Sequence, residues 1–197
     1  CWIKYIKQLN CCKYTFNSTY IKFWRFPYFL RYQPLLKDLI ISFRCLPKLF
    51  LDGLEKFGKY LVNLQRLSLN GSIYEKSINV SFHHIRNLRS LELGLLSTRS
   101  PDIIRLILKL LPQVSSHLQS LRFYWGEKFA PKIASVSPAL KTLNRLSQLK
   151  LSYRANPVYK CQFPMILEAF CECPIHDLTL DITLASEKKL GTIDCKE

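Results

Sequence analysis

Hydrophobic residues recur along the chain in the order L-x-x-L-x-L, which is best formed in NLQRLSLNG at residues 63–71. Leu67 and Leu69 lie two apart, as in a strand with one buried face, but Leu64 lies three before Leu67. The same order, with a Phe or Ile at some positions, occurs at five further places. The first hydrophobic positions of the six copies are Leu46, Leu64, Leu88, Leu118, Leu146 and Ile175. The pattern predicts six short strands that repeat along the chain.

The segments between the copies carry a helical signal of varying strength. Residues 100–113 predict a helix with Ser100 as N-cap, Pro101 in the first turn and its end at Pro112. Residues 52–64 and 164–172 also predict helices. Residues 129–146 are expected to be helical only in parts, because Pro138 interrupts the pattern. Residues 72–85 show no helical stripe, so an irregular connection is expected there.

This alternation of strand, turn and helix resembles the leucine-rich repeat, L-x-x-L-x-L-x-x-N/C-x-L, most closely at LQRLSLNG. The long units resemble the ribonuclease-inhibitor-like class, and in particular the degenerate repeats found behind F-box domains. The Asn or Cys two positions after the strand is missing in every copy. The resemblance covers residues 36–184. It implies an α/β solenoid of about six degenerate repeats, with a curved parallel sheet and with helices and loops on the convex side.

The domain organisation expected from this resemblance has three parts. Residues 1–34 are dense in aromatic and basic side chains and are expected to cap the first repeat or to link it to an upstream segment. Residues 35–184 form the array, and residues 185–197 form a tail. The chain begins at Cys1, which suggests a fragment or a processed piece. An F-box with its L-P-x-E start is absent from these residues.

In such an array the leucines point inward and the residues between them form the concave face. These residues make three predicted ladders. They are Lys48, Arg66, Ser90, Ser120, Gln148 and Asp177; then Phe50, Ser68, Glu92, Arg122, Lys150 and Thr179; and then Asp52, Asn70, Gly94, Tyr124, Ser152 and Asp181. Because acidic and basic residues cancel in the ladders, the net charge of +15 is expected elsewhere.

Aromatic and basic side chains gather on the predicted ladders, and these residue types are enriched where proteins bind one another. The sequence therefore predicts a protein-binding surface on this face. Its residues are Arg66, Ser68, Asn70, Glu92, Arg122, Tyr124, Trp125, Lys150 and Tyr153. Trp125 and Tyr153 have an alternative role, which is to cover the strand ends. By resemblance, the surface would be the substrate-recognition arm of an F-box-type ubiquitin-ligase adaptor.

The charge distribution supports a second class of function. Residues 1–50 hold nine Lys or Arg and one acidic residue. A basic nucleic-acid-binding protein that uses its N-terminal half, with residues 101–150, is therefore an alternative. The aromatic and basic residues at 14–32 would suit base stacking as well as capping.

The eight cysteines form no compact lattice of spacings, which favours free thiols and an intracellular protein in the cytoplasm or nucleus. The N-x-[ST] triplets at Asn17, Asn70 and Asn79 leave an extracellular repeat receptor as another alternative.

Motifs of catalysis and of cofactor binding are absent from the sequence. It contains no G-x-S-x-G, no H-E-x-x-H and no phosphate-binding glycine loop. Cys161, Cys171, Cys173 and His176 do not have the ligand spacing that zinc sites prefer. His83 and His84 are adjacent and are expected to point apart. No apolar run approaches the length of a membrane span. We therefore expect no enzyme, no cofactor, no metal and no membrane span.

Overall fold

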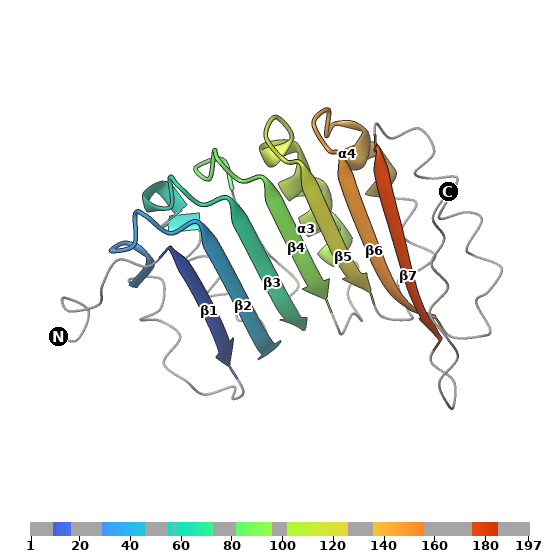
Figure 1. Ribbon diagram of the computed structural model, residues 1–197, viewed down its shortest axis with the longest axis horizontal. Coiled ribbons are helices and arrows are strands. Elements are labelled where there is room, and N and C mark those ends of the chain that lie inside the picture. The colour runs from blue at the N-terminus through green and yellow to red at the C-terminus, as the bar shows by residue number, and fades with distance from the viewer. Residues whose placement is uncertain are drawn as a thin grey trace.

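The computed structural model describes residues 10–16, 29–45, 55–56, 58–72, 82–95, 102–125, 136–155 and 175–184. Seven parallel strands form one open sheet whose order follows the chain, and each strand pairs with the next (Figure 1). The strands are β1 (Cys11–Phe16), β2 (Asp38–Cys45), β3 (Arg66–Ser72), β4 (Ser90–Leu95), β5 (Ser120–Trp125), β6 (Gln148–Ala155) and β7 (Asp177–Leu184).

Successive side chains of a strand point to opposite faces of a sheet, and one face of this sheet is the core. The residues directly across from one another in β2 to β6 include the buried Leu39, Leu67, Leu91, Leu121 and Leu149. Two positions later, Ile41, Leu69, Leu93, Phe123 and Leu151 form a second buried row. Cys12 of β1 and Leu178 of β7 extend the first row at its two ends.

Helical segments lie on the core side of the sheet. Helix α3 (Asp102–Val114) buries Ile107, Leu110, Leu111 and Val114 in the same core as the strands. The helix predicted over residues 100–113 is therefore confirmed. It does not end at Pro112 as predicted but continues for two more residues, to Val114. Helix α4 (Ser137–Lys141) has Pro138 in its first turn, where proline is favoured, and residues 129–135 of the segment predicted to be helical in parts lie outside the described residues. None of the helices in the described segments is long and apolar enough to cross a membrane.

A second period of buried residues, most of them hydrophobic, precedes four of the strands. Buried residues lie six and three positions before the first leucine of a unit, as in Phe82, Ile85 and Leu88. In each set, the N–H of the second and third residue donates to the C=O of the residue three positions earlier. This hydrogen-bond pattern forms 3₁₀-type turns and not α-helix. The predicted helix over 52–64 ends in such turns, with a 3₁₀ helix, η3, at Gly58–Tyr60.

One backbone contact recurs between successive units at the start of the strands. The carbonyl of Gln65, for example, accepts the N–H groups of Arg89 and Ser90 at 2.8 and 2.9 Å. The carbonyls of Asn10, Lys37, Arg89 and Gln119 each accept two N–H groups of the following unit in the same way. Side chains add to the contact, because Asn63 donates its amide to the carbonyl of Pro34 at 2.8 Å, and Asn87 donates to the carbonyl of Val62. The units therefore repeat in backbone geometry as well as in sequence.

The first predicted strand is wrong. The neighbour of β3 is β2, whose hydrophobic positions are Leu36, Leu39 and Ile41, and no room remains between these two strands for a strand at Leu46. Residues 46–54 lie outside the described segments. The spacing from Leu36 to Leu64 is 28 residues, close to the later spacings, whereas Leu46 required a unit of only 18. A search for leucines alone passes over the Ile41 copy.

The sheet also begins earlier than predicted. Strand β1 falls inside residues 1–34, the segment expected to be a cap or linker, and it pairs with β2 from Cys11↔Asp38 to Phe16↔Phe43. This segment therefore contributes a strand to the sheet, which has seven strands and not six. At the other end, β7 ends at Leu184, where the array was predicted to end.

Candidate functional site

The candidate site is the polar face, defined here as the sheet positions that alternate with the buried hydrophobic rows. The register confirms five members of each predicted ladder, since Arg66, Ser90, Ser120, Gln148 and Asp177 are consecutive backbone partners. The sixth member is wrong in each case. Asp38, Ile40 and Ser42 of β2 occupy the positions that were assigned to Lys48, Phe50 and Asp52.

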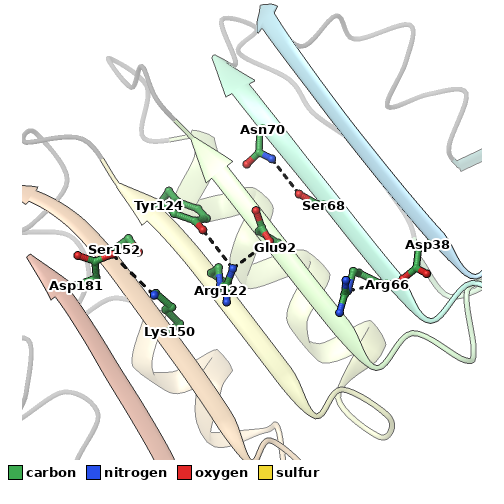
Figure 2. Close-up of polar contacts among 10 residues, drawn as sticks. All are labelled: Asp38, Arg66, Ser68, Asn70, Glu92, Arg122, Tyr124, Lys150, Ser152 and Asp181. Atoms are coloured by element: carbon green, nitrogen blue, oxygen red, sulfur yellow. Dashed lines mark hydrogen bonds and ion pairs between the residues drawn. The ribbon is translucent and has the colours of Figure 1, made fainter. Parts of the chain in front are cut away.

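Ion pairs join neighbouring strands across the polar face (Figure 2). Arg66 lies 3.7 Å from Asp38, Arg122 lies 3.7 Å from Glu92, and Lys150 lies 3.9 Å from Asp181. Arg66 and Arg122 are directly opposite their partners in the ladder, whereas Lys150 reaches diagonally to the next position. All three pairs are partly exposed, so each contributes about 0–1 kcal/mol to stability. Their main effect is to orient side chains that a partner can contact.

On β5, the guanidinium of Arg122 contacts two side chains, Tyr124 of the same strand and Glu92 of β4. Its Nη1 donates to the Tyr124 hydroxyl at 3.4 Å while the same nitrogen faces Glu92 (Figure 2). On the next strands, the Ser152 hydroxyl donates to Asp181 at 3.5 Å. Arg122, Tyr124 and Lys150 thus present two cations and a phenol ring on adjacent strands, and all three side chains are partly buried.

On β3, the side-chain amide of Asn70 is hydrogen-bonded to the buried hydroxyl of Ser68. Asn70 donates its Nδ2 to the Ser68 hydroxyl at 2.9 Å, and Ser68 is only 2% exposed. Gly94 lies directly opposite Asn70, and a Cβ there would overlap the Asn70 amide, coming within 2.8 Å of its Cγ. The absence of a side chain at Gly94 therefore lets Asn70 lie across β4. Asn70 belongs to the sheet surface, in the ladder where the sequence places it.

Charge is balanced in the three ladders of the polar face. Their described basic residues are Lys13, Arg66, Arg122 and Lys150, and their acidic residues are Asp38, Glu92, Asp177 and Asp181. Arg154, opposite Thr183, lies one alternating position beyond the third ladder. The balance predicted from the sequence is therefore retained with two members exchanged, Lys13 and Asp38 in place of Lys48 and Asp52. The three ladders therefore carry no net charge.

Two predicted surface residues are placed only by their backbone. Trp125 and Tyr153 are partners in the β5–β6 ladder, two positions after the buried Phe123 and Leu151. Their side chains lie outside the described part of the structure. Their role in binding, or in covering the strand ends, stays a prediction.

The remaining chemistry-bearing residues form no site among the described segments. There, no group of three or more His, Cys, Asp or Glu side chains could hold a metal ion. Cys161, Cys171 and Cys173 lie outside these segments. His83 and His84 do not point apart as predicted, because they lie in a turn where their ring centroids are 3.7 Å apart. Cys12 is buried, and burial, with the neighbouring Cys11, raises the pKa of its thiol.

Sequence reasoning missed two sets of residues in this region. Asp38, Ile40 and Ser42 belong to the polar face, and accepting isoleucine at the third hydrophobic position would have found them. The inter-unit hydrogen bonds of Asn63 and Asn87 were also missed, although the asparagine immediately before the first leucine is common to both units.

Comparison with known proteins adds no relative. No protein-family model matches the chain, and neither the curated proteins nor the solved structures include a match to it.

Proposed function

We propose that this chain is a leucine-rich-repeat protein of the ribonuclease-inhibitor-like type, and that its polar face binds a partner protein. The repeat assignment is supported by the L-x-x-L-x-L order and by units of 24–30 residues between Leu36 and Ile175. It is also supported by the backbone contact that recurs from unit to unit at the start of the strands.

The observation that carries the binding proposal is the composition of the polar face in register. Its side chains form continuous rows across seven strands, with paired charges of both signs and a hydrogen-bonded Arg–Tyr pair. Mixed charge with partly exposed Arg and Tyr suits recognition of a protein surface, where charge complementarity sets specificity and aromatic or Arg side chains supply much of the affinity. Nucleic-acid phosphates would require an excess of cations, which the three ladders of this face lack.

A pair of matched variants tests the proposal. The face variant is Arg122→Ala, Tyr124→Ala and Lys150→Ala. The edge variant is Arg86→Ala, Tyr32→Ala and Lys59→Ala, which removes the same residue types and the same net charge from the turns before the strands. Both variants and the wild type serve as baits in cell extract, and the captured proteins are quantified by mass spectrometry.

We expect one or more proteins to be captured by the wild type and by the edge variant but to be absent with the face variant. Cross-links from the captured protein should then map to β4–β6. If every captured protein is retained by the face variant, the polar face is not the binding surface. Circular dichroism of each variant establishes that the fold is retained.

The resemblance to F-box-associated repeats extends this proposal to a substrate-recognition arm inside the cell. We expect the natural protein to co-precipitate the adaptor that joins F-box proteins to cullin ligases. Failure to bind this adaptor would remove the ligase role and leave the binding module. Thiol counting separates this role from an extracellular receptor: an intracellular protein should show eight reactive cysteines after denaturation without reductant.

A further inference from the structure

A second surface is basic, whereas the ladders of the polar face are balanced in charge. The strands are parallel, so the turns before them lie together along one edge of the sheet, the upper edge in Figure 1. We call the turns at residues 29–37, 58–65, 82–89, 115–119, 142–147 and 175–176 the lead-in edge. Its ionisable Lys, Arg and His residues are Arg31, Lys37, Lys59, His83, His84, Arg86, Arg89, His117, Arg145 and His176, and every one is exposed.

These turns contain no aspartate or glutamate, whereas the three ladders of the polar face beside them have equal numbers of acids and bases. Asp38 and Asp177, the first residues of two strands, directly follow two of the turns, and Asp38 is paired with Arg66. The exposed Glu55 comes three residues before the turn at 58–65. All four histidines of the chain are on this edge. Four of the six turns hold Lys or Arg, six residues in all, and the other two hold a histidine each. A surface whose fixed charges have one sign attracts polyanions.

Aromatic rings are interleaved with these cations. The Arg31 guanidinium carbon lies 5.9 Å from the centroid of the Tyr32 ring and 5.5 Å from that of Tyr60. The Lys59 ammonium lies 5.2 Å from the Tyr60 ring, so a cation–π cluster joins the turns before β2 and β3. Tyr32 is 53% exposed, and the exposed Leu35 and Val62 belong to the same two turns.

We propose that the lead-in edge binds single-stranded nucleic acid. Cations along a row track a phosphate backbone, and exposed rings beside them stack bases, which is how proteins bind single strands without reading sequence. Parallel strands lie about 4.8 Å apart, so the six turns extend over about 24 Å, the length of a short single strand. An acidic peptide would be attracted by the same cations but would gain little from the exposed Tyr32 ring.

The test uses fluorescence anisotropy with a labelled poly(U) RNA of about 20 nucleotides, longer than the site of a typical single-strand-binding module, and the full chain. We expect binding that weakens with salt, with a log–log slope reduced in the edge variant by roughly 0.7 for each phosphate that the variant no longer neutralises. Tyr32→Ala alone should weaken binding about tenfold, since it removes base stacking but no charge. The face variant, which has the same net charge as the edge variant, should bind as the wild type does.

Three outcomes would overturn the proposal. They are absence of RNA binding in roughly 50 mM salt, an equal decrease of affinity in the face and edge variants, and an unchanged affinity in Tyr32→Ala. Unlabelled poly-glutamate provides a further arm. If it displaces the RNA at equal charge concentration, and its own binding is abolished in the edge variant, the edge takes an acidic protein segment. The proposed function is independent of this result, because loss of protein capture is tested with the face variant, whereas loss of RNA binding is tested with the edge variant.

Discussion

The proximity of Gly94 to Asn70 yields the sharpest prediction for stability. In Gly94→Ala, the new methyl group would occupy the position of the Asn70 amide, so this amide must rotate away from β4. The backbone of Gly94 does not oppose the change, because among the described glycines a positive φ occurs at Gly71 and not at Gly94. Any destabilisation therefore comes from the displaced side chain.

The magnitude follows from the hydrogen bond that Asn70 would give up. Its 2.9 Å hydrogen bond to Ser68 contributes about 0.5–1.5 kcal/mol, and Ser68 is buried, so an unpaired hydroxyl raises the cost further. Against this, alanine restricts the unfolded chain more than glycine does, which stabilises by about 0.4–1 kcal/mol. We expect Gly94→Ala to lower the free energy of unfolding by about 1 kcal/mol in the wild-type background. In an Asn70→Ala background it should be neutral or stabilising.

Urea denaturation followed by circular dichroism measures the four proteins of this double-mutant cycle. The expected coupling energy between positions 70 and 94 is about 1–2 kcal/mol. Additive effects, with a coupling below about 0.3 kcal/mol, would refute the reasoning that the missing side chain at Gly94 exists to seat the Asn70 amide. Ser90→Ala, at an outward position of the same strand, is the control and should couple with neither residue.

Three further predictions concern the core, the inter-unit hydrogen bonds and a thiol. Leu121→Ala, in the fully buried first row, should lower the free energy of unfolding by about 2–5 kcal/mol in thermal or urea denaturation, while Gln119→Ala at an exposed position should change it little. Asn63→Ala should cost about 1 kcal/mol, because the bond to the Pro34 carbonyl is removed, and Asn63→Asp should not restore it, since a carboxylate cannot donate. During brief alkylation at about pH 8 read by mass spectrometry, the exposed Cys11 should react before Cys12; the raised pKa of Cys12 keeps its thiol protonated at this pH, and equal rates would contradict its burial.

The hydrophobic spacing predicted much of the sheet. Leucines at 64, 88, 118 and 146 each precede a strand, and the polar-face ladders follow from alternation within those strands. The first two strands were missed because the predicted pattern required leucine, whereas other apolar residues fill the same buried positions. Ile41 fills the same position as Leu69, and Cys12 the same position as Leu39 and Leu67, so a leucine motif misses the first two strands.

The cross-strand contacts could not be predicted in the same way. The distance from Arg122 to Glu92, or from Lys150 to Asp181, depends on register and on side-chain reach between units that are about 30 residues apart. The contact between the rings of His83 and His84 was missed for a different reason. The expectation that they point apart assumed a regular helix or strand, whereas the two residues lie in a turn.

The sequence by itself determined the buried rows of strands β3 to β6 and that the units repeat, because alternation and hydrophobic spacing are local properties of the chain. It also determined the size of the positive charge. Only the tertiary structure decided how the charges of the described residues are distributed, since parallel strands bring the turns from six units to one edge and the balanced ladders to one face. The physical reason is that a parallel sheet aligns equivalent positions of every unit, so residues far apart in sequence become neighbours on one of two distinct surfaces.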